Sequence, residues 1–476
     1  MLFNSFEFAF FLPTVFVLYW FVFNRNLNLQ NLLLVVVSYI FYGWWDWRFL
    51  SLLLVSSVAD FYLGKTMYHS TDERKRKLLL YASLTLNLGI LGFFKYFNFF
   101  VDSFIEAFSM FGFELSPRTL NIILPVGISF YTFQTLSYTI DIYRKKLVPT
   151  ENPISFFAFV SFFPQLVAGP IERATHLVPQ FQKARQFDVK LAMDGGRQIL
   201  WGFFKKVVIA DSCAPIVNEI FGNHAEMDTA YLLLGAVYFA FQIYGDFSGY
   251  SDIAIGTARL FGFDLMQNFN MPYFSRDIGE FWRRWHISLS TWFRDYVYIP
   301  LGGSYGNKWT RIRNIIITFT VSGFWHGANW TFIVWGFLNG LYYLPLMLVD
   351  RQGANKGKVV AEGKWLPNIR EIGQIGVTFF FTIIAWVFFR AESISHAVSY
   401  LYRMFTNAQF SVPSGKLEPL LFIGILLAME WMQRGEAHGF TMKKVPVAVR
   451  WTIYTVTTIL IFKSFTVDQT FIYFQF

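Results

Sequence analysis

Long apolar stretches recur along the whole chain and constrain its fold more than any other feature of the sequence. They lie at residues 8–23, 32–45, 49–59, 78–94, 122–140, 231–244, 330–349, 375–389, 419–428 and 451–462. Several approach the roughly 20 residues that a helix needs to cross a hydrocarbon core of about 30 Å, and others are shorter. Only 15% of the residues are charged, against about 25% in a soluble domain. The sequence therefore predicts an all-α polytopic membrane protein with some half-membrane pieces, in one domain over residues 1–476.

Basic residues gather in short loops, which sets the orientation of membrane helices. The cluster Lys65 and 74–77 predicts a cytoplasmic loop after the third span, and so an N-terminus outside the membrane. Further inside loops are predicted at 144–146, at Lys356, Lys358, Lys364 and Arg370, and at Arg434, Lys443, Lys444 and Arg450. The segment 95–118 and the end, 471–476, are expected outside. Residues 3–23 lack a basic start and a cleavage site, so they read as a retained first span.

Residues 269–313 form a long, basic and aromatic segment that the same charge rule places in the cytoplasm. Within it, 302–307 has the glycines of a turn. Residues 282–286 alternate bulky rings with cations, which is typical of a helix in the membrane interface, with tryptophan at headgroup depth.

His326 is the histidine with apolar sequence on both sides, and an ionisable group placed this way is a functional candidate. The 13 residues from Arg313 span about 20 Å of helix, so His326 is expected near the middle of the bilayer. Gly323 and Gly327 weaken the helix there, and broken backbone at that depth requires a cavity. Further helix breaks that could line this cavity are predicted at Pro125, Gly127, Pro164, Gly169 and Pro170.

The other histidines lie in different settings. His69, His176, His224, His396 and His438 occupy polar or loop-like sequence, where a solvated side chain is expected. His286 lies among arginines and tryptophans, and both a functional and an anchoring role stay open for it. For His326 the alternative to function is a core imidazole bonded to a carbonyl group.

A buried, neutral imidazole is suited to take a proton from a hydroxyl group and return it, which predicts His326 as a general base. Ser322 is expected to bond to the backbone rather than to act as a nucleophile. Around His286, the cations Arg283, Arg284 and Arg294 are candidates to hold a phosphate-bearing thioester donor such as acetyl-CoA. Lys205 and Lys206 are weaker candidates for the same donor site.

The sequence gives little support for metal binding, a disulfide or nucleic-acid binding. The histidines at 286 and 326 and the acids Asp246, Asp252 and Asp277 have no recognisable metal-ligand spacing. Asp246 and Asp252 are expected to cap or join helices rather than to act in catalysis. The lone Cys213 excludes an internal disulfide. No motif for DNA or RNA binding is present, so no nucleic-acid partner is predicted. No permanent cofactor and no metal are predicted either.

The motifs at 242–252, 282–303, 322–328 and 471–476 resemble the membrane-bound O-acyltransferase family, and within it the AlgI-like branch of bacterial alginate and polysaccharide O-acetyltransferases. The resemblance implies roughly 10–12 membrane helices, with re-entrant and interfacial pieces, around a central funnel. It also implies that His326 matches the catalytic histidine and His286 a second, cytoplasmic-side histidine.

Together these observations predict an O-acyltransferase of the bacterial inner membrane. It would move an acetyl group from cytoplasmic acetyl-CoA across the membrane to an exported or cell-envelope polysaccharide, with a periplasmic, hydrolase-like partner. D-alanyl transfer from a carrier protein to teichoic acid, as in the DltB-like cousins, is one alternative. A polysaccharide or lipid transporter without chemistry is another.

Overall fold

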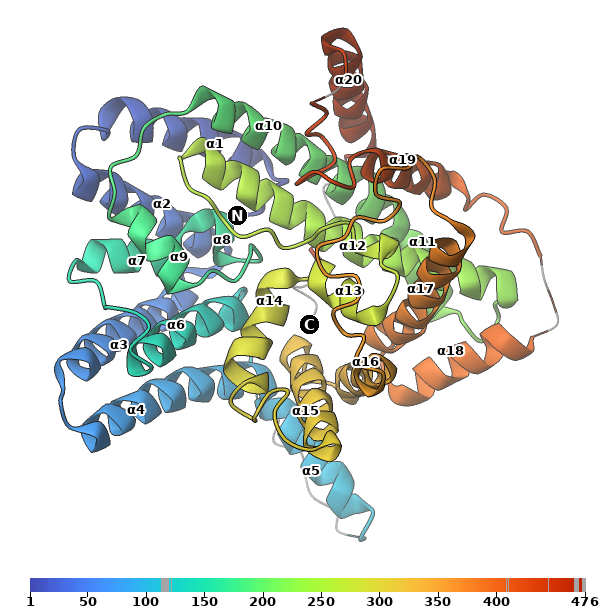
Figure 1. Cartoon of the computed structure of the whole chain (residues 1–476), viewed down its shortest axis with the longest axis horizontal. Coiled ribbons are helices and arrows are strands. Elements are labelled where there is room, and N and C mark those ends of the chain that lie inside the picture. The colour runs from blue at the N-terminus through green and yellow to red at the C-terminus, as the bar shows by residue number, and fades with distance from the viewer. Residues whose placement is uncertain are drawn as a thin grey trace. The chain divides into compact units, whose positions relative to one another are not determined.

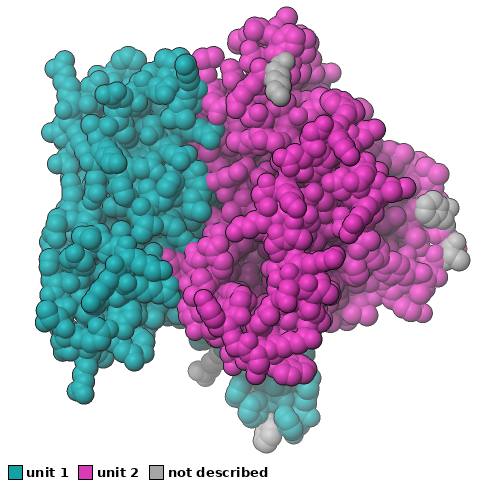
Figure 2. All heavy atoms as spheres, viewed as in Figure 1, with its two compact units in different colours: residues 1–192, 257–266 teal, residues 193–256, 267–476 magenta. Residues whose placement is uncertain are grey.

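The computed structural model describes residues 1–112, 120, 122–407, 409, 411–443, 445–465 and 471–472. Part of the predicted outer segment 95–118, Lys444 and the final residues 473–476 lie outside this range. Within it the chain is helical and contains no β-strand (Figure 1). Two compact units divide the chain: unit 1 comprises residues 1–192 and 257–266, and unit 2 comprises residues 193–256 and 267–476 (Figure 2).

Each predicted apolar stretch coincides with a helix. These helices are α1 (Phe6–Val17), α2 (Leu27–Asp46), α3 (Leu50–His69), α4 (Glu73–Leu91), α6 (Ile128–Tyr143), α12 (Thr229–Leu260), α16 (Trp330–Leu348), α17 (Ile369–Arg390), α19 (Glu418–Met432) and α20 (Val447–Ser464). Among the described residues, five helical segments are long and apolar enough to cross a membrane, at Leu27–His69, Glu73–Ser109, Thr229–Leu260, Trp330–Leu348 and Ile369–Arg390. The half-membrane pieces that the sequence expects stay a prediction.

Polar side chains begin several of these helices. The side chain of Asn26 accepts hydrogen bonds from the first turn of α2, and Asp72 does the same for α4. Asn368 and Glu371 form a capping box at the start of α17. Such caps satisfy backbone N–H groups that have no partner inside the helix, which fixes where each helix starts.

Unit 1 contains the helix breaks that the sequence predicts at proline and glycine. Gly127 has φ +74° and comes directly before α6, and a Cβ atom there would lie 2.8 Å from the carbonyl oxygen of Leu166. Pro164 lies in the first turn of the short helix α8 (Phe163–Leu166), which ends before Gly169. The breaks are therefore present as predicted. That these breaks line a cavity around His326 stays a prediction.

Unit 2 contains the predicted basic segment. Its helices are α13 (Ile278–Arg284), α14 (Ile287–Phe293) and α15 (Lys308–His326), with a turn before α15 in which Gly302, Gly303 and Gly306 all have positive φ. The predicted turn is thus confirmed. The interfacial location of Trp282 and Trp285 stays a prediction, and both side chains are buried in the protein, at 8% and 1% exposed. Trp282 packs against Trp335 at 5.7 Å and Trp285 against Trp386 at 5.0 Å between ring centroids.

Helices α15 and α16 approach each other closely at a pair of glycines. A Cβ atom at Gly323 would lie 2.2 Å from the carbonyl oxygen of Phe332, and one at Gly336 would lie 2.3 Å from that of Phe319. Small residues permit such backbone approach between membrane helices. Gly323 lies within α15 and Gly327 follows its end, so of the two predicted weak points only Gly327 marks a break.

Candidate functional site

His286 and His326, which are 40 positions apart in the sequence, lie beside each other in unit 2. Their ring centroids are 6.4 Å apart. His326 is 4% exposed and His286 is 1% exposed. The structure therefore brings together the two histidines that the sequence singles out, in a buried setting.

His326 is the last residue of α15, and its position follows from the way this helix ends. Gly327 is extended, with φ −163° and ψ 156°, and Asn329 then caps α16 by accepting a hydrogen bond from Thr331. The imidazole ring lies 5.0 Å from the rings of both Trp325 and Trp335 and 5.4 Å from that of Phe389. The ring is thus held in an aromatic cage at a helix break.

His286 lies between α13 and α14 in the left-handed region, with φ 43° and ψ 55°. A residue other than glycine in this region costs free energy and requires support from its surroundings. Asn268 supplies it: its carbonyl oxygen accepts from the N–H of Ile287 at 2.8 Å, and its Oδ1 lies 3.2 Å from Nδ1 of His286. Burial lowers the pKa of His286 to about 3, so the imidazole is neutral at physiological pH.

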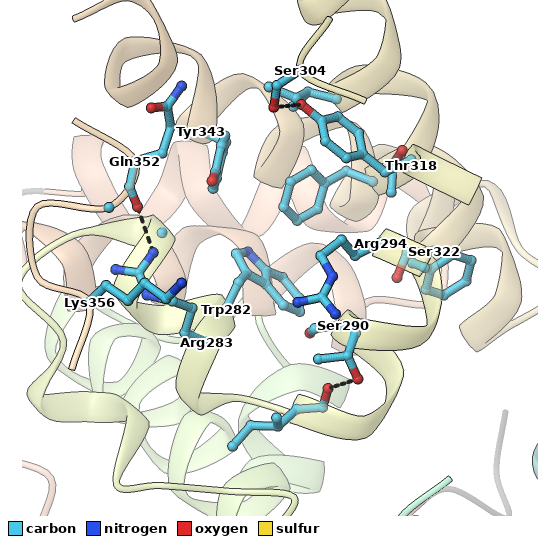
Figure 3. A pocket seen from close by; sticks show the side chains of 18 of the residues that line it. Trp282, Arg283, Ser290, Arg294, Ser304, Thr318, Ser322, Tyr343, Gln352 and Lys356 are labelled. Carbon is cyan, nitrogen blue, oxygen red and sulfur yellow. Dashed lines mark hydrogen bonds between the residues drawn. The ribbon is translucent and has the colours of Figure 1, made fainter. Parts of the chain in front are cut away.

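A cavity of about 700 Å³ opens among α13, α14, α15 and the segment after α16. Figure 3 shows Arg283 and Lys356 on one side of it and Arg294 and Ser322 on the other, with Trp282 between. Its lining also includes Arg311, and among the described residues that line it there is no carboxylate. The surface of unit 2 in Figure 2 is visibly hollowed. This volume and positive charge fit a small anionic ligand.

The cavity adjoins the histidine pair. Its wall includes Ile287, which directly follows His286, and Ser322, one helical turn before His326. Trp282 also lines the cavity and packs against Trp335, whose ring contacts that of His326. The packed rings of Trp282 and Trp335 therefore connect the cavity to His326.

The three predicted donor-binding arginines occupy different places. Arg283 and Arg294 line the cavity, where Arg283 donates to the carbonyl oxygen of Gln352 at 2.6 Å. Arg294 is 59% exposed and pairs with the neighbouring Asp295. Arg284 does not line this cavity, because its guanidinium binds the buried carboxylate of Glu280 at 2.9 Å.

Lys205 and Lys206 do not line the cavity. Lys205 is 3% exposed and pairs with Asp252 at 2.5 Å, while Lys206 is 6% exposed and pairs with Asp246 at 2.6 Å. Both lysines lie on the π-helix η4 (Phe204–Ala210) and both acids on α12. The prediction that the acids join helices is confirmed, and the structure uses the lysines for the same purpose.

Among the remaining histidines the expectation of a solvated side chain is wrong for His438, which is 3% exposed with Nε2 3.2 Å from Oδ1 of Asp194. His224 and His396 stack on each other at 4.3 Å. Sequence reasoning also missed Asn268, Arg311 and Lys356 as site residues. The two cations are indistinguishable in sequence from other loop charges, and no local pattern marks Asn268 as a partner of His286.

Comparison with known proteins identifies the fold. The family model of the membrane-bound O-acyltransferases matches residues 39–355. "Probable alginate O-acetylase AlgI" of Pseudomonas aeruginosa is 42% identical over 425 residues, which are 88% of this chain and 77% of that protein. "Peptidoglycan O-acetyltransferase" of Helicobacter pylori is 37% identical over 433 residues, 85% of this chain and 80% of that protein.

A third relative, "Teichoic acid D-alanyltransferase" of Bacillus subtilis, is 30% identical over 292 residues, which are 58% of this chain and 71% of that protein. The family match covers both histidines and all the helices that form the cavity. The predicted alternative of a transporter without chemistry therefore loses its support. The chain belongs to the membrane-bound O-acyltransferase family, and it is a multi-pass membrane O-acyltransferase.

Proposed function

We propose that this protein moves an acetyl group from cytoplasmic acetyl-CoA across the inner membrane for O-acetylation of an exported or cell-envelope polysaccharide, with a periplasmic hydrolase-like partner. The observation that carries the proposal is the buried pair of His286 and His326 beside a cation-lined cavity. Relatives named for alginate and peptidoglycan acetylation match 85% or more of the chain, which supports acetyl transfer to a glycan.

In the proposed reaction, His326 takes the proton of an acceptor hydroxyl group while the oxygen attacks the thioester carbonyl carbon. The new C–O bond forms, the C–S bond breaks, and the imidazolium returns the proton to the leaving thiolate. The ring centroids of the two imidazoles are 6.4 Å apart, so reacting groups that bind to one ring lie within a few ångströms of the other. His286 would help to hold or orient the thioester donor.

The cavity is the proposed donor site. Arg283 and Arg294 line it, and Arg311 and Lys356 extend the positive surface toward its other walls. A coenzyme A donor carries several phosphate charges, which fixed cations hold. Arg284, engaged by Glu280, is the natural comparison because it differs from Arg283 in access to the cavity and not in charge.

Membranes that contain a His326→Ala variant test the proposed base. Acetylation of the envelope glycan should fall by about 100- to 10,000-fold at an unchanged level of the protein in the membrane. Full acetylation at that level would refute the role of His326.

For the donor site, Arg283→Ala should raise the KM for labelled acetyl-CoA by about tenfold, as loss of one charged hydrogen bond of about 1.5 kcal/mol predicts. Arg284→Ala is the matched control and should leave this KM unchanged.

D-alanyl transfer to teichoic acid is the second candidate, favoured by the match to the Bacillus subtilis protein over 58% of this chain. Incubation of membranes with labelled acetyl-CoA and, separately, with a charged carrier protein distinguishes the donors. Incorporation from the carrier protein alone would replace the acetyl proposal by the D-alanyl one.

A further inference from the structure

Asn268 makes several hydrogen-bond contacts around His286. It lies after α12 in unit 2 and is fully buried. Its Oδ1 lies 2.9 Å from Oγ and 3.3 Å from the backbone nitrogen of Ser288, and 3.2 Å from Nδ1 of His286. Its Nδ2 donates to Oγ of Ser251 at 3.1 Å.

These contacts fix which atom of the Asn268 amide faces His286. The backbone N–H of Ser288 can only donate, so the atom that receives it must be the carbonyl oxygen of the amide. An oxygen at this position can only accept from the imidazole. Nδ1 of His286 must then carry the hydrogen, and Nε2 must carry the lone pair in the neutral ring.

We propose that Asn268 is a positioning residue that holds His286 as the Nδ1–H tautomer, so that Nε2 can act only as an acceptor toward the reacting groups. The proposal rests on the proposed function for the role of His286 in catalysis. A ring with an acceptor Nε2 can receive the proton of a hydroxyl group or of a protonated partner, and cannot donate to a carbonyl oxygen. This assigns His286 to proton acceptance rather than to polarisation of the thioester carbonyl.

Aromatic rings pack against the imidazole of His286 beside this hydrogen bond. The ring of His286 is packed by Phe247 of α12 at 4.5 Å, by Phe269 at 6.3 Å and by Trp325 at 6.1 Å, which are apolar ring contacts. The titratable side chain that these ring contacts bring against it is His326 of α15. Two acids of α12, Asp246 before Phe247 and Asp252 after it, are paired with Lys206 and Lys205.

Nitrogen NMR on the full-length protein in lipid bilayers tests the tautomer directly. The histidines are labelled with ¹⁵N, and the signals of His286 are assigned by their loss in a His286→Gln variant. We expect a protonated Nδ1 and an unprotonated Nε2 from pH 5 to pH 8, and a mixture of tautomers in Asn268→Ala. A protonated Nε2 in the unchanged protein, or signals unaffected by Asn268→Ala, would overturn the proposal.

Acetyl transfer from labelled acetyl-CoA in membrane vesicles supplies the second readout. Asn268→Ala should lower kcat by about 10- to 100-fold, the usual effect of removing a group that orients a functional histidine. Gln267→Ala is the matched control, because Gln267 is in the same loop and its side chain donates to the carbonyl oxygens of Phe269 and Ala437. It should leave kcat within about twofold, because these bonds of Gln267 go to backbone carbonyl groups and not to His286 or Ser288.

Asn268→Asp separates positioning from a merely structural role. A carboxylate can accept the same bonds, yet it raises the pKa of the adjacent imidazole, so activity should fall on the acidic side and recover as pH rises. A reduction that is equal at every pH would contradict the proposal. Full transfer by His286→Gln would instead refute the catalytic role of His286, while leaving the NMR result to stand on its own.

Discussion

Unit 1 and unit 2 bury polar side chains in different ways. In unit 1 the fully buried Asp60 of α3 accepts from the hydroxyl of Ser83 at 2.6 Å and from the amide of Asn87 at 2.8 Å. In unit 2 the buried lysines of η4 pair directly with carboxylates of α12. Hydroxyl and amide groups surround the carboxyl group of the first cluster, while lysines pair with the carboxylates of the second.

The difference affects how well each cluster tolerates substitutions. Removal of one member of a buried ion pair leaves an uncompensated charge, which costs far more than the loss of a neutral hydrogen bond. Unit 2 also carries the histidine pair and the cavity. In the unit that contains the candidate site, buried ion pairs thus join helices, and α12 connects both features through Asp246 and Phe247.

Among the substitutions that test this comparison, Lys206→Met is expected to cause the largest loss of stability. Lys206 lies 2.8 Å from Asp211 and 2.6 Å from Asp246, so its loss leaves two buried carboxylates without their cation. The free energy of unfolding should fall by about 3–5 kcal/mol, measured by unfolding in detergent micelles. Lys443→Met, which affects a pair that is 71% exposed on the lysine side, is the control. Equal stability of the two variants would show that unit 2 does not depend on its buried charges.

Much of this organisation follows from the sequence. Apolar length predicts the helices at each of the stretches, and the extended Gly327 ends α15 at His326 as expected. Local sequence also identifies both histidines, because an imidazole within apolar or ring-rich surroundings is uncommon. These features depend on neighbours in the chain, which is why the pattern reveals them.

Other features depend on residues that are distant in the sequence. Lys205 and Lys206 look like membrane-surface lysines until α12 brings Asp252 and Asp246 to them. Arg283 and Arg284 are adjacent and chemically alike, yet one faces the cavity and the other binds Glu280. The orientation of a side chain on a short helix is set by tertiary packing, so the sequence could name the cations without separating their roles.

A smaller loss of stability is expected when the hydrogen bonds around Asp60 in unit 1 are removed. Asn87→Ala removes the amide that donates to Asp60 and the oxygen that accepts from Ser56 at 2.7 Å. The stability should fall by about 1–3 kcal/mol, the cost of unsatisfied buried polar groups. Asp60→Asn is the matched change, since it keeps the shape and can retain the bond from Ser83. A loss from Asn87→Ala as large as that from Lys206→Met would remove the contrast between the two interiors.

The smallest effect concerns a charged contact of unit 1, at His176 on α9 (Ala174–Phe181). Hydrogen bonds to Asp264 and then to Glu172 raise the pKa of His176 to about 10. Because the folded state holds the proton more tightly, the stabilisation is fully present below pH 6.5 and disappears as pH rises through about 10. His176 is partly exposed, so solvent screening keeps the effect small. The thermal midpoint should decline across this interval and lose that part of its slope in His176→Gln, with His69→Gln as the exposed control. An identical slope in His176→Gln would mean that unit 1 gains no stability from this charge, and the contrast with unit 2 would then be complete.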